Sequence, residues 1–303
     1  GADVIDGNLG DDTIDGGLGD DTIDGGEGAD LLFGADGADV IDGGAGADTI
    51  TGGTGDDDIE GGSGSDTVVF AGNKGDFTFA VASDGTLTVT DVGTGNTLGV
   101  DTVSGVETLS FADGDLTVTT LESGAVTLAG SGVGDDITLT GAVGATLEGD
   151  AGVDTLTGGS GGDVIDGGLG DDTIDGGEGA DTIDGGDGDD TIVGGLGDDT
   201  IDGGYGDDVV VFTGVQSDYT FQSSSDGLTV TVTDVDTSEA DTITGVETLS
   251  FTDGEITVSQ DAGQLVLTGS DGVGDNIMVV GDIAVTVAGV GGDDTIDGGE
   301  GAD

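Results

Sequence analysis

Residues 167–175 read GGLGDDTID and residues 176–184 read GGEGADTID, and this nine-residue period decides the fold. Followed outward, the same register gives seven units over 149–211 and seven more over 7–69, after a partial unit at 1–6. A further run begins at 289. Each unit follows G-G-x-G-x-D-x-U-x, in which U is a large aliphatic residue. A disordered acidic segment has no reason to keep such a period, so the pattern predicts a repetitive folded structure.

The composition excludes several classes of function. The 303 residues include 66 Asp and Glu against one Lys or Arg, for a net charge of −65. There is no Cys and no His, which excludes disulfides, thiolate nucleophiles and histidine-based catalysis. Because Lys74 is the only cation, we expect no nucleic-acid partner. No apolar run approaches the roughly 18 residues that span a bilayer, so we expect no membrane insertion.

The nine positions of the repeat have separate chemical roles. Glycine at positions one, two and four permits positive φ, and we expect all three to let the backbone curl tightly and point carbonyl oxygens inward. The aspartate at position six adds a carboxylate to those oxygens. Hard oxygen ligands on a flexible loop suit Ca²⁺, whereas Mg²⁺ demands stricter geometry. The repeat therefore predicts Ca²⁺ as a cofactor, at roughly one ion per nonapeptide.

The predicted metal ligands are the position-six aspartates. They are Asp3, Asp12, Asp21, Asp30, Asp39, Asp48, Asp57, Asp66, Asp154, Asp163, Asp172, Asp181, Asp190, Asp199, Asp208, Asp294 and Asp303. The alternative for each is an acidic turn residue without a metal. Aspartates at position five, such as Asp11 and Asp171, and at position nine are interpreted as solvated surface.

Positions seven to nine alternate as a short strand with U pointing inward. A six-residue turn plus a three-residue strand is half a coil, so two repeats predict a coil of 18 residues with two parallel sheets. One aliphatic side chain per nine ordered residues is a thin core. We therefore predict that the arrays unfold without their metal.

Two segments depart from the period and match each other: FAGNKGDFTF begins at Phe70 and FTGVQSDYTF begins at Phe212. Alternating apolar residues around Asp84-Gly85 and Asp113-Gly114 predict antiparallel hairpins. Most aromatic residues lie in or next to these segments, which predicts a conventional core there. We interpret the inserts as caps and spacers, with a ligand-binding module as the alternative. The predicted domains are arrays at 1–69 and 149–211, small antiparallel β inserts at 70–148 and 212–288, and the start of a third array at 289–303.

The nonapeptides resemble those of the RTX (repeats-in-toxin) family. The string D-T-x-x-G-V-E-x-L-x-F-x-D-G at Asp101 and Asp241 resembles a segment that commonly follows such arrays. The resemblance implies an all-β fold in which parallel β-roll (β-solenoid) arrays hold calcium between successive turns and alternate with the inserts. It also implies secretion through a type I channel.

These observations predict a calcium-dependent structural module of a large secreted, extracellular protein at the cell surface. An adhesin stalk, a surface layer or a filament would fit, with self-association through calcium bridges between acidic faces. The alternative is the RTX tail of an exoenzyme, a protease or lipase, whose catalytic domain lies elsewhere. The chain itself is not expected to be an enzyme, because Ser160 matches a nucleophile elbow within GGSGG but no His exists to activate it.

Three further expectations concern single features. Lys74 is expected to form exposed ion pairs of little energetic value. Tyr205, in a turn, is expected to be an exposed aromatic residue, with a lateral contact as the alternative. The first three residues, Gly1-Ala2-Asp3, are identical to the last three, Gly301-Ala302-Asp303, and overlaying them continues the nonapeptide register. This predicts that the sequence is one period of a longer tandem polymer.

Overall fold

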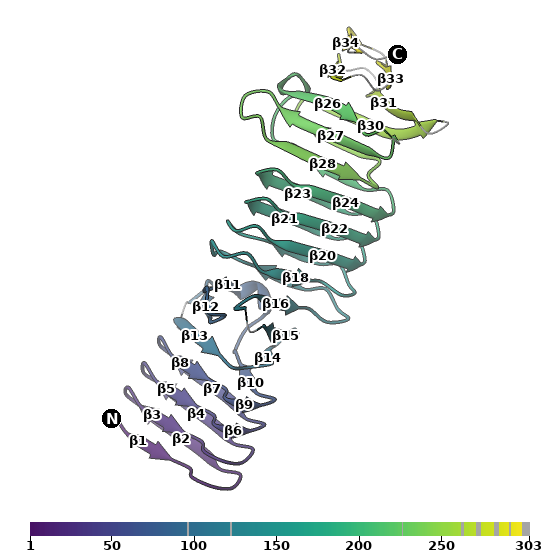
Figure 1. Ribbon diagram of the computed structural model, residues 1–303. Helices are drawn as coiled ribbons and strands as arrows, with labels where there is room; N and C mark the ends of the chain where they lie inside the picture. Colours follow the sequence, from purple (N-terminus) through teal and green to yellow (C-terminus); the bar gives the residue numbers. More distant parts are fainter. Residues whose placement is uncertain are drawn as a thin grey trace. The chain divides into compact units, whose positions relative to one another are not determined.

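The structure is a computed structural model, and its chain divides into two compact units. They are Gly1–Asp150 and Ala151–Asp303, and each is an array of short stacked strands followed by an insert (Figure 1). The described residues are 1–95, 97–121, 123–225, 227–261, 264–270, 274–281, 285–290 and 292–298. The structure is all-β apart from two single 3-10 turns, and among the described residues no helix is long and apolar enough to cross a membrane.

The array of the first unit is a solenoid in which each residue pairs in parallel with the residue 18 positions later. Ile5 pairs with Ile23, and Ile14 pairs with Leu32. Successive repeats therefore alternate between two sheets, as predicted for an 18-residue coil. One sheet contains β1 (Val4–Asp6), β3 (Thr22–Asp24), β5 (Val40–Asp42) and β8 (Asp58–Glu60), and the other contains β2 (Thr13–Leu18), β4 (Leu31–Asp36), β7 (Thr49–Thr54) and β10 (Thr67–Val69). The turn strands β6 (Ala45–Gly46) and β9 (Ser63–Gly64) pair with each other.

The second unit repeats the same solenoid. Ile174 pairs with Ile192 on one sheet, and Ile165 pairs with Ile183 on the other. One sheet contains β19 (Thr155–Thr157), β21 (Thr173–Glu178), β23 (Thr191–Leu196) and β25 (Val209–Val211), and the other contains β20 (Val164–Leu169), β22 (Thr182–Asp187) and β24 (Thr200–Tyr205).

Many strands are twice as long as the predicted three residues. In β20 and β22 the pairing continues past the strand proper, since Gly168 pairs with Gly186 and Leu169 with Asp187. The first three positions of the next repeat therefore also join the sheet. The glycines at positions one and two present no side chain that would separate the stacked backbones.

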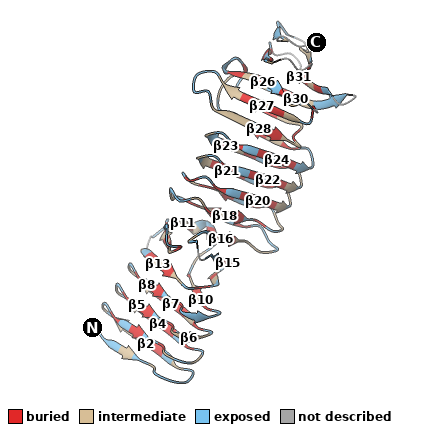
Figure 2. Cartoon of the chain, in the orientation of Figure 1, coloured by how far each residue is buried: buried red, intermediate tan, exposed pale blue. Residues whose placement is uncertain are grey.

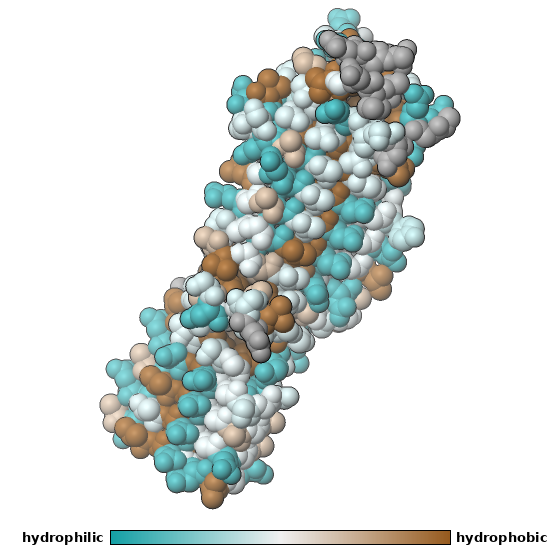
Figure 3. Space-filling view, in the orientation of Figure 1, coloured by the Kyte–Doolittle hydropathy of each residue, from teal (hydrophilic) through white to brown (hydrophobic). Residues whose placement is uncertain are grey.

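The aliphatic U residues form the core of each array. Leu32, Ile50, Leu156 and Ile174 are fully buried, whereas Ile5 at the first turn is only half-buried. The buried residues run along the strand centres of each array (Figure 2). The array surface is mainly hydrophilic or near-neutral, with separate apolar side chains (Figure 3). Tyr205 is 81% exposed, as expected from its turn position.

The inserts contain the predicted hairpins, but they join the arrays through parallel strands. In the first unit β13 continues the sheet of β8, with Val103 opposite Ile59, and β14 continues the sheet of β10, with Leu109 opposite Val68. Antiparallel strands follow on each side. The strands are β11 (Phe77–Val81), β12 (Leu87–Asp91), β13 (Val100–Ser104), β14 (Thr108–Phe111), β15 (Gly114–Thr120), β16 (Val126–Ala129), β17 (Asp136–Thr138) and β18 (Thr146–Glu148), with a 3-10 turn η1 (Lys74–Asp76).

The second insert has the same design. Ile243 lies opposite Ile201, and Leu249 lies opposite Val210, so this insert also extends both sheets of its array. Its elements are η2 (Gln216–Asp218), β26 (Tyr219–Ser223), β27 (Thr229–Asp234), β28 (Ala240–Thr244), β29 (Thr248–Phe251), β30 (Gly254–Asp261), β31 (Gln264–Gly269), β32 (Asn276–Met278) and β33 (Thr286–Ala288). The strand β34 (Thr295–Asp297) lies within the predicted start of the third array.

Each insert has an aromatic core, as predicted. In the first unit the rings of Phe70, Phe77 and Phe79 pack around Phe111 at centroid distances of 5.2 to 6.1 Å. In the second unit Phe212, Tyr219 and Phe221 surround Phe251 at 5.1 to 6.0 Å.

Candidate calcium-binding sites

The position-six aspartates form a continuous buried row in each array. One carboxylate oxygen, Oδ1, accepts the backbone N–H of the position-six residue one coil earlier. Asp39 accepts from Asp21 at 2.8 Å, and Asp199 accepts from Asp181 at 2.9 Å. The bond joins residues 18 apart, so each carboxylate links two stacked turns of the same edge.

The second oxygen, Oδ2, is buried and has no hydrogen-bond partner in the described part of the chain. An unpartnered buried carboxylate oxygen is costly, and a row of them fits a set of cation ligands. This condition holds for Asp12, Asp21, Asp30, Asp39, Asp48, Asp57, Asp66, Asp172, Asp181, Asp190, Asp199 and Asp208.

Nearly all of these oxygens face a small space beside the position-one glycine of the same repeat. A Cβ placed on Gly185 would lie 2.5 Å from Asp190 Oδ2 and 2.5 Å from the carbonyl oxygen of Gly203. The same holds at Gly25, where Asp30 Oδ2 lies at 2.6 Å and the carbonyl oxygen of Gly43 at 2.7 Å. A carboxylate oxygen and a carbonyl oxygen therefore converge where a side chain would otherwise be.

The reason for glycine at position one differs from our prediction. Positive φ occurs at positions two and four, as at Gly186 (φ +100°) and Gly188 (φ +149°), but not at the position-one glycines of the described repeats. Position one is glycine because a Cβ there would collide with the two oxygens. Three residues other than glycine adopt positive φ at position two: Asn8, Ala35 and Asp150.

The local charge and burial disfavour bare carboxylates in this row. Burial raises the pKa of Asp181 and of Asp208 to about 6, while the accepted backbone N–H opposes the shift. The neighbouring carboxylate of Asp199 raises the pKa of Asp181 further. A bound cation would reverse this balance by favouring the ionised form.

The donor set fits a hard cation that takes many oxygens. Within the described residues, no three acidic side chains converge closely enough to hold a metal. A metal in this row must therefore take most of its ligands from backbone carbonyls and few from side chains. Such mixed carbonyl and carboxylate sites suit Ca²⁺.

The predicted ligands are not all equivalent in the structure. Asp3 and Asp294 are exposed, and Asp12 is half-buried, because each lies near the end of a stack. Asp303 lies outside the described residues. Asp154 and Asp163 are buried like the central members. Asp66 and Asp208 begin the link to the insert, since each donates its backbone N–H to a glutamate, Glu107 at 2.8 Å and Glu247 at 3.0 Å.

Our sequence reasoning missed acidic residues of the inserts that continue the row. Asp101 Oδ1 accepts the N–H of Asp57 at 2.9 Å, and Asp241 Oδ1 accepts that of Asp199 at 3.1 Å. Burial raises the pKa of Asp101 and of Asp241 to about 7, the highest values in the row. A signal was present, because Asp101-Thr102-Val103 reads like positions six to eight of a repeat.

Position-five aspartates act on the outer surface, consistent with their interpretation as solvated. Asp171 Oδ1 accepts the N–H of Asp189 at 3.0 Å, and Asp11 Oδ1 accepts that of Ala29 at 3.0 Å. These exposed carboxylates accept an N–H from the next coil, whereas the position-six carboxylates accept an N–H from the preceding coil. They cap backbone donors and do not face the glycine space.

Lys74 differs from our prediction of exposed ion pairs. Its side chain is completely buried, and its Nζ lies 2.9 Å from Asp135 Oδ1 and 3.6 Å from Asp113 Oδ1. Breaking a buried pair of this kind costs about 3–5 kcal/mol, well above the value of an exposed pair.

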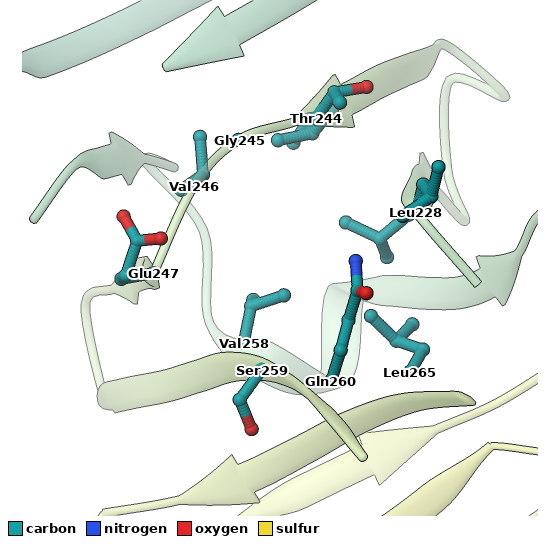
Figure 4. A pocket seen from close by; sticks show the side chains of 11 residues that line it. Leu228, Thr244, Gly245, Val246, Glu247, Val258, Ser259, Gln260 and Leu265 are labelled. Carbon is teal, nitrogen blue, oxygen red and sulfur yellow. The ribbon is translucent and has the colours of Figure 1, made fainter. Parts of the chain in front are cut away.

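One pocket of the second insert bears on the alternative of a ligand-binding module. It encloses 260 Å³, and Val246, Val258 and Leu265 make much of its wall. Figure 4 shows Glu247 on the side of the pocket away from Leu228. Glu247 Oε2 already accepts the backbone N–H of Asp208, so the main charged group of the pocket serves the array.

A comparison with protein families identifies the same repeats. A family profile described as "RTX calcium-binding nonapeptide repeat (4 copies)" matches residues 1–32, 33–68, 148–183, 184–214 and 270–303. No curated protein matches the chain. The AlgE6R3 subunit of the mannuronan C5-epimerase from Azotobacter vinelandii is 26% identical, with 32% of this chain and 71% of that chain covered and a TM-score of 0.20. The extracellular lipase LipA from Serratia marcescens is 23% identical, with 78% of this chain covered and a TM-score of 0.22, and the match spans 38% of that lipase.

Proposed function

Because the chain belongs to the family of RTX calcium-binding nonapeptide repeats, we propose that it is a structural module of a larger secreted protein that folds on binding Ca²⁺. The matched repeats are calcium-binding and not catalytic, and repeats of this type are typical of secreted proteins. The observation that carries the proposal is the row of buried Oδ2 atoms without partners, most of which lie with a carbonyl oxygen beside a glycine.

The chain's own residues divide the work of folding. Position-six aspartates hold the ion and, through Oδ1, the backbone of the preceding coil. Position-one glycines leave the space for it. Without the ion, adjacent carboxylates repel each other in a poorly solvated row, and the thin aliphatic core does not offset this. Calcium therefore controls whether the arrays are folded.

Calcium concentration provides the physical basis for a role outside the cell. Extracellular calcium-binding modules typically have dissociation constants on the order of 10⁻⁴–10⁻³ M. A chain with such sites stays unfolded at the low calcium level of the cytosol and folds after export. Within this class we propose a cell-surface role as an adhesin stalk, a surface layer or a filament, with calcium bridging acidic faces of neighbouring chains. The alternative is the tail of an exoenzyme, which a catalytic domain elsewhere in the parent chain would support.

A calcium titration of one matched pair of variants tests the calcium-binding function. Asp181→Asn removes a buried ligand charge, whereas Asp187→Asn removes an exposed charge from the end of β22 in the same array. We expect β structure in far-UV circular dichroism to appear with calcium in the wild type and in Asp187→Asn. Asp181→Asn should need several-fold more calcium. Full β structure in chelator, or equal midpoints for both variants, would overturn the proposal.

Electron microscopy of the protein in millimolar calcium and in chelator tests the assembly role. Filaments or sheets that disappear in chelator would support a self-assembling structural protein. Isolated rods would instead favour a stalk or the exoenzyme tail, with the activity elsewhere in the parent chain.

A further inference from the structure

The two units differ at one buried position that is otherwise equivalent. Lys74 begins η1 and Gln216 begins η2, and both side chains are at most 1% exposed. Their backbone N–H groups make the same bond, to Asp113 Oδ1 in the first unit and to Asp253 Oδ1 in the second, each at 2.9 Å. The backbone frame is therefore shared, and only the side chain changes from a cation to a neutral amide.

In the first unit the ammonium group meets two acidic residues. Lys74 Nζ lies 2.9 Å from Asp135 Oδ1, and it donates to the backbone carbonyl of Asp113 at 3.1 Å. Asp135 is 2% exposed, so water does little to solvate its charge. The lysine thus supplies the positive charge that a buried carboxylate requires.

In the second unit no protein cation takes this role. Gln216 Nε2 donates to Asp275 Oδ1 at 3.4 Å, and Gln216 Oε1 accepts the N–H of Asn276 at 2.8 Å. Asp275 is 1% exposed, and its Oδ2 has no hydrogen-bond partner among the described residues. A carboxamide carries no charge, so the carboxylate of Asp275 is buried without compensation.

Both carboxylates belong to a turn built like the array sites. Asp135-Asp136-Ile137 and Asp275-Asn276-Ile277 read D-x-U, and Ile137 and Ile277 are fully buried. Asp135 Oδ2 lies against Gly130, where a Cβ would also be 2.7 Å from the carbonyl oxygen of Gly149. Asp275 Oδ2 also lies against a glycine, Gly269, where the atoms nearest to an added Cβ all belong to the Asp275 carboxyl group. The approach of Oδ2 to a glycine is therefore common to both units, but Asp135 Oδ2 accepts the N–H of Ser131 at 2.7 Å, whereas Asp275 Oδ2 has no partner among the described residues.

We propose that Lys74 is an internal cation that replaces one bound calcium ion, and that the second unit binds an additional Ca²⁺ at Asp275, where Gln216 leaves the charge unbalanced. This inference rests on the proposed calcium-binding function. It makes the insert of the first unit less dependent on calcium than the insert of the second. The two inserts, alike in sequence and fold, then complete their folding at different calcium concentrations.

Reciprocal exchange of the two residues tests the proposal in the full chain. Native mass spectrometry in calcium resolves the number of ions bound per chain. We expect Gln216→Lys to bind one ion fewer than the wild type and Lys74→Gln to bind one ion more. Gln222→Lys, at an exposed position of β26, adds the same charge away from Asp275 and should leave the count unchanged.

Tyr219 provides a second readout that is specific to the second insert. Both tyrosines of the chain lie in the second unit. Tyr219 stands three residues after Gln216, and its ring centroid lies 5.3 Å from that of Phe251. In a Tyr205→Phe background its fluorescence reports this insert alone. Gln216→Lys should lower the calcium midpoint of the Tyr219 signal several-fold, and Gln222→Lys should not.

The outcomes separate the inference from the proposed function. A wild type that binds no calcium overturns the proposed function and with it the inference. A wild type that binds calcium normally, with unchanged ion counts in both exchange variants, overturns the inference alone. If Gln216→Lys shows no Tyr219 transition because it does not fold, the ion count of Lys74→Gln decides.

Discussion

The arrays and the inserts extend the same sheets but stabilise them by different means. An array buries one aliphatic side chain and one carboxylate per nonapeptide, as Ile183 and Asp181 illustrate. An insert packs three aromatic rings around a single phenylalanine, Phe111 or Phe251. The first arrangement contains a row of unbalanced charges, and the second is apolar. From this comparison we expect a solenoid to become metal-dependent where carboxylates replace apolar contacts between its turns.

Calcium removal should produce the largest difference between the two regions. In chelator we expect backbone amides of β20, β22 and β24 to lose protection from hydrogen exchange completely. Amides near Phe79 and Phe111 should keep part of theirs, because the aromatic cluster needs no ion. Hydrogen exchange with mass spectrometry measures both regions at once. Equal loss of protection in array and insert would show that the two regions form one cooperative unit.

Truncating an aromatic side chain should destabilise the insert more than the array, the reverse of the effect of calcium removal. Phe111→Ala is expected to destabilise the first insert by about 3–5 kcal/mol, because it removes the ring that contacts three others. Phe33→Ala, a half-buried residue of β4, is the matched control in the array and should cost less. Urea denaturation in saturating calcium gives both values. Equal costs would contradict the assignment of the apolar core to the insert.

The pH dependence of the calcium-free protein provides a subtler comparison. Burial raises the pKa of Asp57 and Asp181 to about 6, and that of Asp241 to about 7, from an ordinary 3.8. At a pH between 3.8 and these raised pKa values, the aspartates of the folded array hold protons that the same aspartates have released in the unfolded chain. Stability in chelator should therefore fall as the pH rises from about 4 to about 7. Circular dichroism in chelator should show more β structure at pH 5 than at pH 8, and the reverse order would refute the explanation.

The smallest expected effect concerns backbone strain within the array. Ala35 occupies position two with φ +81°, where the equivalent Gly44 and Gly53 have no side chain. Ala35→Gly should stabilise the calcium-bound array by about 1 kcal/mol, because alanine is disfavoured at positive φ. Thermal denaturation in calcium, with Ala38→Gly at a position-five site as control, measures this difference. Destabilisation by Ala35→Gly would show that the φ strain is relieved by local contacts.

Much of the fold could be predicted from the period alone. Ile14, Ile23 and Leu32 recur every nine residues, and this spacing fixes the coil, the inward row and the two sheets. The hairpins followed from alternation around Asp84-Gly85 and Asp113-Gly114. The domain boundaries and the individual calcium ligands remain predictions.

The parts that could not be predicted depend on contacts between distant residues. Asp101 joins the carboxylate row only because β13 stacks on β8, and it lies 44 residues from Asp57 rather than 18. Lys74 and Asp135 are 61 positions apart, and no local pattern indicates that both are buried. The sequence predicted a positive φ for the position-one glycine, which was wrong. The repeat alone cannot show that a neighbouring turn places a carbonyl oxygen against this glycine.

Because one coil contains two repeats, the structure depends on whether an array has an odd or an even number of repeats. The sixth full repeat of the first unit provides β8, which receives β13, and the seventh provides β10, which receives β14. Deleting one nonapeptide would exchange the sheets on which these strands dock, so the insert would leave the array half a turn around the solenoid axis from its present direction. Deleting two would restore the direction and shorten the array by one coil. Recombination between near-identical repeats therefore preserves the orientation of an insert relative to the start of its array only when repeats are gained or lost in pairs.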